Sequence, residues 1–342
     1  MSTARELGEH ALIARILQRL RPRPFVVVGA GDDAAVVAPE PRTLDALTMD
    51  ALVEGVHFDR RFVDAASVGH RLLAVSLSDL AAMGARPRVA LLSLALPDSL
   101  EASWLDGMLD GLLALADAHG IALVGGNITR SPGPLLLDLA ATGSVRPRRV
   151  LVRSGARPGD GVYVTGALGG ARVGLHALQH RHGVASPAPG DAALAQAAYP
   201  VCEQRYLRPT PRVRAGQLLG RSRAATACMD LSDGLADAAR AIAAASGVGV
   251  TLDAAAVPVE PEALPWLTGC GLDPVEAALA GGDDYELLFT SGARQRGRLR
   301  SALRTFGDLP VTRIGTITTD PSVCLRRGDS LVPLVGGFEH FR

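Results

Sequence analysis

Apolar residues recur every three or four positions in three segments of the first half of the chain. These segments are residues 5–20, 66–83 and 105–116. This spacing is typical of helices that bury one face. Gly84 and Gly120 follow the second and third segments, and glycine often ends a helix because it adopts the left-handed conformation without strain. The pattern therefore predicts three helices.

Short apolar or alternating runs predict strands, and turn residues bound many of them. In the first half the predicted strands are residues 25–28, 34–37, 46–49, 89–96, 121–124 and 135–145. In the second half they are residues 162–165, 226–229, 248–252, 286–290, 313–317 and 323–326, with an alanine-rich helix at 235–245. Strands and helices do not alternate regularly, which favours an α+β fold over a βαβ repeat.

A chain of 342 residues is long enough for two domains. The run Arg146-Pro147-Arg148-Arg149 follows the last predicted strand of the first half and reads as the crossing between them. We therefore expect an N-terminal domain at residues 1–149 and a C-terminal domain at residues 150–342.

The amino-acid composition limits the kinds of partner that the protein is expected to bind. Lys+Arg and Asp+Glu both number 35, so no basic excess attracts nucleic acid or an anionic membrane. No run reaches the roughly 20 apolar residues of a membrane span, and Arg15 and Arg19 interrupt the only apolar stretch near the N-terminus. The four cysteines lack metal-site spacing and are expected to be reduced. These features predict a cytoplasmic protein that acts on small molecules, without nucleic-acid or membrane partners.

The chain carries several short acidic motifs but no lysine. These motifs are Gly31-Asp32-Asp33, Asp50, Asp79, Asp230-Leu231-Ser232-Asp233 and Gly282-Asp283-Asp284. The P-loop and the protein kinase signature both require a lysine against the nucleotide phosphates, so neither is available. A bound polyphosphate would need Mg²⁺, arginine and helix N-termini to neutralise it. The chain is therefore a candidate metal-dependent phosphoryl-transfer enzyme.

Three acidic positions in the first half are expected to share a site. Asp33 and Asp50 follow predicted strands that we expect in one small sheet, although an Asx turn would also explain the first. Asp79 lies inside a predicted helix, where an unpaired buried carboxylate is costly. A structural cap is the alternative for Asp79.

In the second half, Asp230 and Asp233 would face one side of a helix that begins at Ser232, close to its positive N-terminus. An ordinary helix cap is the alternative. Arg153 follows the domain crossing and could bind a phosphate through two parallel hydrogen bonds.

Two further candidates lie in the first half. Gly125-Gly126-Asn127 is predicted at a strand-to-loop junction, where glycine lets the backbone approach a phosphate. His57 follows Asp50 closely and is a candidate substrate contact.

Read in order, these motifs resemble the thiamine-monophosphate kinase family. That family belongs to the superfamily of aminoimidazole ribonucleotide synthetase and selenophosphate synthetase. The resemblance spans nearly the whole chain. It rests on Gly31-Asp32-Asp33-Ala34, Asp50 with Leu52 and Gly55-Val56-His57-Phe58, Ser76 to Ala85, Gly125 to Arg130, Arg153-Ser154-Gly155-Ala156, Asp230 to Leu235, Gly281 to Leu287 and Gly337 to Phe341.

The resemblance implies a fold and an activity. The fold would be an aminoimidazole ribonucleotide synthetase-like pair of α+β domains. The first would have a mixed sheet with helices, bind metal and ATP, and pair across a homodimer; the second, an α+β sandwich, would complete the active site. The activity would be transfer of the ATP γ-phosphoryl group to thiamine monophosphate with several Mg²⁺ ions. No general base is assigned, because the acceptor is already an ionised phosphate oxygen.

The resemblance also implies site residues. The metal ligands would be Asp33, Thr48, Asp50, Asp79, Asn127, Asp230 and Asp233. The ATP contacts would be Gly126, Asn127, Arg153 and Ser232. The thiamine-phosphate contacts would be His57, Asp283 and Phe338.

Two positions depart from the family pattern. Asn127 stands where the family has aspartate, which removes a charge, and Asp283 stands where it has glutamate, which shortens the side chain by one methylene. Two alternatives stay open. One is another ATP-using enzyme of the superfamily, of which a selenophosphate synthetase is disfavoured because no cysteine lies near the N-terminal motifs. The other is a nucleotide-binding homodimer that has lost activity.

Overall fold

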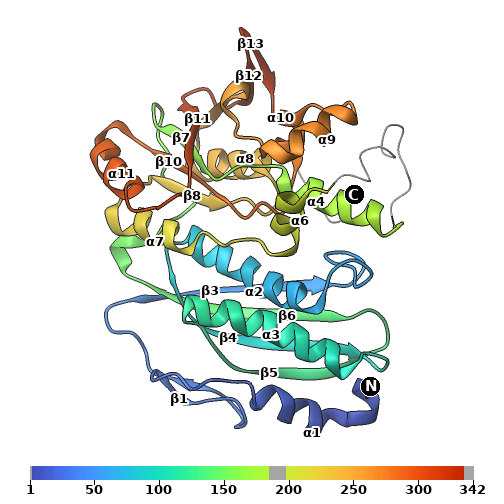
Figure 1. The fold of residues 1–342 in the computed structure, drawn as a ribbon. Coiled ribbons are helices and arrows are strands. Elements are labelled where there is room, and N and C mark those ends of the chain that lie inside the picture. The colour runs from blue at the N-terminus through green and yellow to red at the C-terminus, as the bar shows by residue number, and fades with distance from the viewer. Residues whose placement is uncertain (1, 185–197, 335–342) are drawn as a thin grey trace. The chain divides into compact units, whose positions relative to one another are not determined.

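The computed structural model describes residues 2–184 and 198–334. The chain divides into two compact units (Figure 1). The first comprises residues 1–80 and 86–147, and the second comprises residues 81–85 and 148–342. Both combine helices with a sheet, which confirms the predicted α+β class.

The first unit is built around a four-stranded mixed sheet with strand order β3-β6-β4-β5. Its elements are α1 (Ala4–Leu17), β1 (Val26–Val28), β2 (Val36–Val37), β3 (Leu44–Val53), α2 (Ala65–Ala82), β4 (Arg86–Pro97), α3 (Ala102–His119), β5 (Ala122–Ser131) and β6 (Leu136–Val145). The three predicted helices are all present, and Gly84 and Gly120 adopt the positive φ angles expected after the second and third.

The two faces of this sheet differ in burial. Leu92 of β4 lies opposite Leu139 of β6, and both are buried on the face that packs against α2. On the other face, Met49 of β3 and Leu91 of β4 flank Ala140 of β6 and are exposed. One face is thus a core, whereas the other is an open apolar surface around Met49 and Leu91 and is covered by residues 25–37 at Val89 and Ala122.

Helices α2 and α3 approach each other closely because glycine stands at the contacts. A Cβ atom on Gly69 of α2 would lie 1.8 Å from the carbonyl oxygen of Met108, and one on Gly111 of α3 would lie 1.9 Å from that of Ala66. Figure 1 shows these helices running along the strands of the sheet. Their close packing fixes α2, which carries Asp79.

Three expectations about the first unit were wrong. Asp50 does not end a strand but lies inside the ten-residue β3, because the alternation continues past it to the buried Leu52. Asp33 follows β1, which pairs with β2 in a separate two-stranded sheet. Gly126 and Asn127 lie within β5 rather than in a loop. The β4–β5 ladder shifts register just before them and then continues through the glycines.

The second unit contains a seven-stranded sheet with strand order β13-β12-β9-β11-β7-β10-β8. Its elements are η1 (Pro147–Arg149), β7 (Gly161–Thr165), α4 (Gly170–Arg181), α6 (Pro200–Leu207), α7 (Val213–Ser222), β8 (Ala227–Asp230), α8 (Leu235–Ser246), β9 (Gly249–Asp253), η2 (Ala254–Ala256), η3 (Pro261–Ala263), α9 (Leu264–Gly269), α10 (Pro274–Ala280), β10 (Leu287–Ser291), η4 (Ala293–Gln295), α11 (Arg296–Leu303), β11 (Val311–Thr318), β12 (Val323–Arg327) and β13 (Ser330–Pro333). The alanine-rich α8 joins the core of this sheet through Ala238, Ala239 and Ile242.

The contact between α2 and α3 generates a stability prediction. Gly69→Ala places a methyl group against the Met108 carbonyl and should lower the free energy of unfolding by about 1–3 kcal/mol or more. Gly133→Ala is the matched control, because a Cβ atom there meets no atom within 4 Å. Thermal unfolding of both variants measures the difference. Equal midpoints would contradict the packing described.

Candidate active site

Asp50 and Asp79 form an acidic pair in the first unit. Asp50 lies on β3 and accepts a hydrogen bond from the Ser76 hydroxyl of α2 at 2.8 Å. Asp79, three residues further along α2, accepts one from the Thr48 hydroxyl of β3. The side-chain oxygen atoms of Thr48 and Asp50 on β3 therefore face those of Ser76 and Asp79 on α2.

Electrostatics of this pair favour a bound cation. Burial, the neighbouring Asp79 and also Asp138 raise the pKa of Asp50 to about 6, and the Ser76 hydroxyl opposes the shift. Repulsion of this kind is relieved by a proton or by a positive ion. Carboxylate and hydroxyl oxygens suit Mg²⁺, which commonly takes one or two carboxylates and completes its shell with substrate phosphates.

Within the described ranges, no three His, Cys, Asp or Glu side chains gather in a metal-holding group. Asp50 and Asp79 contribute two carboxylates, and Thr48 and Ser76 contribute two hydroxyl groups.

The structure does not bring the other predicted metal ligands of the first unit to this pair. Asp33 is exposed, and its backbone N–H donates to the Asp32 carboxylate at 2.8 Å. Asn127 lies opposite Ser93, whereas Asp50 lies opposite Leu139. Ser93 and Leu92 alternate along β4, so this register assigns Asn127 and Asp50 to opposite faces of the sheet. The metal roles of Asp33 and Asn127 stay predictions, as does the ATP contact of Gly126.

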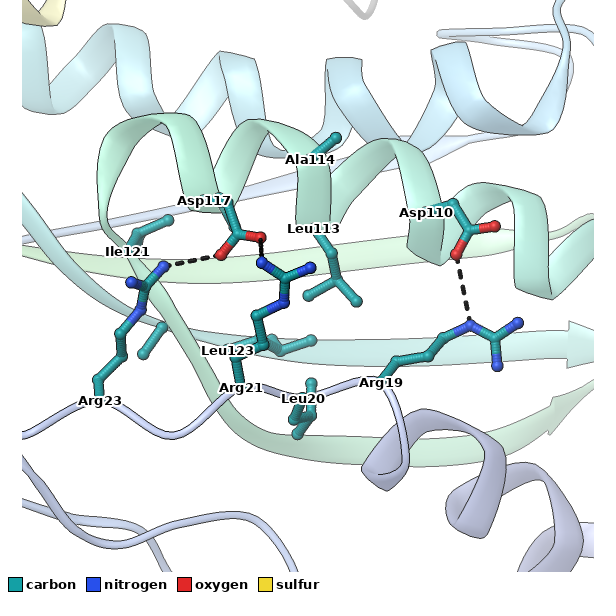
Figure 2. Close-up of a pocket in the computed structure, with 12 residues that line it drawn as sticks. Arg19, Leu20, Arg21, Arg23, Asp110, Leu113, Ala114, Asp117, Ile121 and Leu123 are labelled. Carbon is teal, nitrogen blue, oxygen red and sulfur yellow. Dashed lines mark hydrogen bonds and ion pairs between the residues drawn. The ribbon is translucent and has the colours of Figure 1, made fainter.

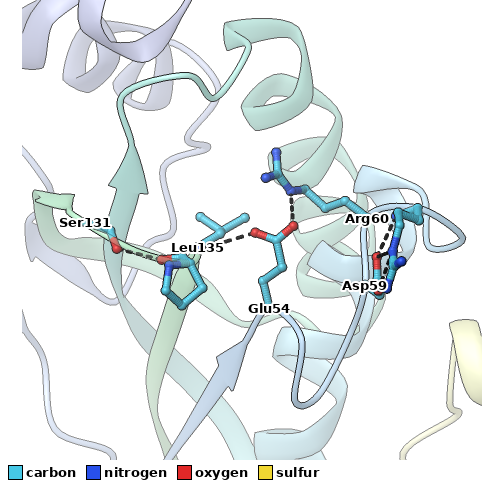
Figure 3. A network of polar contacts seen from close by, with 7 residues as sticks. Glu54, Asp59, Arg60, Ser131 and Leu135 are labelled. Atoms are coloured by element: carbon cyan, nitrogen blue, oxygen red, sulfur yellow. Dashed lines mark hydrogen bonds and ion pairs between the residues drawn. The ribbon is translucent and has the colours of Figure 1, made fainter. Parts of the chain in front are cut away.

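His57 lies in a tightly bonded turn after β3. Its Nδ1 atom accepts the Val53 N–H at 3.1 Å, which leaves the ring proton on Nε2 in the neutral form. Figure 3 shows Glu54 holding this turn, because its carboxylate pairs with Arg60 and accepts the Leu135 N–H at 3.3 Å. The turn therefore fixes His57 in position, and its substrate contact stays a prediction.

In the second unit, two segments carry predicted site residues side by side. Residues 231–234 connect β8 to α8, and residues 281–286 precede β10. The Asp283 N–H donates to the Ser232 carbonyl at 2.8 Å, and the Tyr285 N–H donates to the Leu231 carbonyl at 3.0 Å. The structure thus brings Ser232 and Asp283 together.

The expected helix start at Ser232 was wrong. Asp230 is the last residue of β8, and α8 begins at Leu235 after Gly234, whose φ of 104° interrupts any helix from Ser232. Glycine is required there because an added Cβ atom would meet the Leu279 and Gly281 carbonyl oxygens at 2.8 Å. Asp230 is buried and Asp233 is exposed. They therefore do not share a helical face, and their metal roles stay predictions.

Arg153 lies beside β8. The preceding residue, Val152, accepts the Cys228 N–H at 2.8 Å, and Ser246 of α8 donates to the Arg153 carbonyl at 3.3 Å. The side chain of Arg153 is exposed, so it is available to a ligand. Phe338 lies outside the described residues.

The 281–286 segment is anchored by buried acidic side chains that the sequence analysis did not assign. Glu286 is fully buried, accepts the Thr165 hydroxyl at 2.6 Å and is paired with the forked guanidinium of Arg212. Arg205 of α6 lies 3.5 Å from the same carboxylate and also pairs with Glu260. A buried glutamate requires positively charged partners, so Glu286 in the Gly281–Leu287 motif could have indicated that arginine partners exist. The sequence does not indicate which arginines these are.

Asp284 is the second anchor. It accepts the Gly169 N–H at 2.8 Å, at the N-terminus of α4, so this glycine-rich turn binds the protein's own carboxylate. The other oxygen of Asp284 is buried without a hydrogen-bond partner in the part of the chain that the structure describes. Burial raises the pKa of Asp284 to about 7.

A separate pocket of about 300 Å³ lies in the first unit and contains none of the predicted site residues. Figure 2 shows Asp117 of α3 between Arg21 and Arg23, and Asp110 opposite Arg19. Each arginine is already paired with a carboxylate, so the pocket does not present the unpaired positive charge of a phosphate site.

Two expectations from composition can also be compared with the structure. The four cysteines are free thiols, and burial raises the pKa of Cys202 and Cys228, which favours their inert neutral form. Of the described helices, none is long and apolar enough to cross a membrane.

Matches of the sequence to two protein-family models define the class of protein. Residues 31–145 match the AIR synthase related protein, N-terminal domain, and residues 157–326 match the corresponding C-terminal domain. The protein is therefore an AIR synthase related protein. Two structures of the hydrogenase maturation protein HypE share this fold, with TM-scores of 0.74 at 19% and 20% identity.

Relatives with higher sequence identity identify the family within this class. The chain is 42% identical to thiamine-monophosphate kinase of Escherichia coli strain K12 and 32% identical to that of Bacillus subtilis strain 168; it covers 98% and 100% of them, and both alignments span 98% of this chain. The crystal structure of the Stenotrophomonas maltophilia enzyme has a TM-score of 0.76 at 39% identity, covering 92% of this chain and 94% of that one. The chain belongs to the thiamine-monophosphate kinase family.

Asp284 generates a prediction about pH. Its folded-state pKa of about 7 exceeds its ordinary value of 3.8, so the folded state binds the proton more tightly and loses stability as pH rises between these values. Asp284→Asn mimics the neutral acid and cannot titrate. Relative to the unmodified protein, the unfolding midpoint of Asp284→Asn should therefore rise as pH increases from about 4 to about 7, and the difference should level off at higher pH. A difference that stays constant over this range would show that Asp284 does not titrate as described.

Proposed function

We propose that this protein transfers the γ-phosphoryl group of ATP to the phosphate of thiamine monophosphate, giving thiamine diphosphate and ADP. The observation that carries the proposal is the Asp50–Asp79 pair, whose like charges and oxygen donors suit a cation that binds polyphosphate. The relatives support the substrate. A structure described as AaThiL complexed with AMPPCP and TMP is 32% identical, has a TM-score of 0.72 and covers 100% of this chain and 99% of that one.

Mg²⁺ would be held in the first unit by Asp50, Asp79 and the Thr48 hydroxyl. Bound there with the nucleotide, the ion would neutralise charge on the phosphate oxygens. In the second unit, Ser232 and the exposed Arg153 would contact ATP, with Asp230 and Asp233 as further ligands by family resemblance. By the same resemblance, Asp33 and Asn127 would be metal ligands away from the Asp50–Asp79 pair, and Gly126 would contact the nucleotide.

The protein's part in the reaction is to position two charged substrates. No side chain has to remove a proton, because the attacking phosphate oxygen of thiamine monophosphate is ionised near neutral pH. His57, fixed by the Val53 N–H, and Asp283, fixed beside Ser232, would orient this substrate together with Phe338. Positioning and charge neutralisation then account for the rate.

The open face of the first unit's sheet supports a homodimer. Leu47 and Met49 on β3 are 78% and 67% exposed, and Leu91 adds to the same face. Contiguous apolar surface of this kind commonly marks an interface between proteins. We assign it to a second copy of the chain, because β3 is also an edge strand of its sheet. The cytoplasmic location stays a prediction.

Replacement of Asp50 or Asp230 by asparagine tests the activity. Each change removes the charge of a proposed metal ligand and should lower the turnover of thiamine monophosphate by about 100-fold or more. Asp45→Asn, at an exposed position on β3, is the matched control and should retain activity. Chelation of Mg²⁺ should abolish turnover and its return should restore it. Near-normal rates in both site variants would contradict the proposal.

Replacement of Leu47 and Met49 by glutamate tests the dimer. Two charges on the open face should convert a dimer to a monomer in sedimentation experiments, because they cannot be buried without partners. Leu331→Glu is the control, since Leu331 is 56% exposed on β13 of the other unit. A monomeric unmodified protein, or a dimer that survives both changes, would argue against this interface.

A further inference from the structure

Asp283 and Tyr285 flank the buried Asp284 in an unusual backbone conformation. Their φ angles are 66° and 49°, in the left-handed region that residues other than glycine rarely adopt. Such strain persists only where the surrounding structure enforces it, and it is concentrated at functional sites. Two strained residues in one short segment therefore indicate that neighbouring contacts hold the segment in this conformation.

The cause is anchoring from two sides. On one side, backbone hydrogen bonds join Asp283 and Tyr285 to residues 231–232. On the other, Asp284 accepts the Gly169 N–H, and Glu286 accepts hydrogen bonds from Thr165 and Arg212. Contacts of Asp284 and Glu286 with the rest of the unit thus hold the segment on either side of Tyr285.

The consequence is a direct contact between Asp283 and Tyr285. The Tyr285 hydroxyl donates to Oδ1 of Asp283 at 3.0 Å. Tyr285 is only 7% exposed, so packing fixes its ring and hence the position of the hydroxyl. Asp283 itself is half-buried, beside Ser232. The carboxylate of Asp283 is therefore oriented before any ligand binds.

We propose that Tyr285 is a positioning residue for substrate binding: its hydroxyl orients the Asp283 carboxylate toward the cationic portion of thiamine monophosphate. This inference rests on the proposed function, in which Asp283 contacts that substrate. Orientation matters more for an aspartate than for a glutamate, because the shorter side chain has less reach with which to correct a misplaced carboxylate.

A double-mutant cycle tests this role through steady-state kinetics. Tyr285→Phe keeps the packed ring and removes only the hydroxyl. It should raise KM for thiamine monophosphate about threefold to tenfold, as expected for one lost hydrogen bond, while kcat and KM for ATP change little. In an Asp283→Ala background, Tyr285→Phe should have little further effect on this KM, because the carboxylate that the hydroxyl orients has been removed.

Tyr163→Phe is the control for loss of a tyrosine hydroxyl elsewhere. Tyr163 lies on β7 and stacks on Phe289 with ring centroids 5.4 Å apart. This variant should leave KM unchanged, and thermal unfolding of all variants checks that they fold. An unchanged KM in Tyr285→Phe, or an equal effect with and without Asp283, would overturn the positioning role while leaving the proposed function intact. An unmodified protein that does not turn over or bind thiamine monophosphate would overturn both.

Discussion

The structure depends on one constraint: buried negative charge must be compensated by positive charge or by hydrogen-bond donors. The chain has no lysine, so arginine, backbone N–H groups or an external cation must perform the compensation. In the second unit the protein compensates Glu286 internally, because Arg212 and Arg205 face its carboxylate. At Asp50 the influences on the pKa are burial, two other carboxylates and a hydroxyl, with no cationic side chain among them. In the proposed function, a bound cation takes this compensating role at Asp50 and Asp79.

The same compensation shapes the backbone of the second unit. Arg212 and Arg205 pair with the buried Glu286, and Glu286 in turn constrains the strained segment that precedes it. Gly166 shows how tightly the carboxylate is enclosed, because a Cβ atom there would lie 1.9 Å from Glu286 Oε1. The charge pairs of Glu286 thus help to hold Asp283 and Tyr285 in their strained conformation.

The sequence predicted local structure well where one element determined it. The helical spacing of residues 66–83 correctly placed Asp79 inside α2, and the glycines after α2 and α3 marked their ends. The resemblance to the family was correct, and it rested on motif order rather than on any single motif.

The sequence predicted less where distant partners decide the outcome. Asp50 was expected at a strand end because polar residues often stop a strand, yet the full ladder with β6 extends β3 beyond it. Arg212 meets Glu286 from a segment 74 residues away, and no local pattern indicates that pairing. Asp33 was assigned to the wrong sheet for the same reason, since short strands do not reveal their partners.

Product formation by the unmodified protein tests the central claim most directly. The purified protein would be mixed with ATP and Mg²⁺, with thiamine monophosphate or free thiamine as acceptor, and the products separated by chromatography. The account predicts thiamine diphosphate from the monophosphate and no phosphorylated product from free thiamine. Binding of ATP without any product from thiamine monophosphate would contradict it and would favour a nucleotide-binding relative that has lost activity.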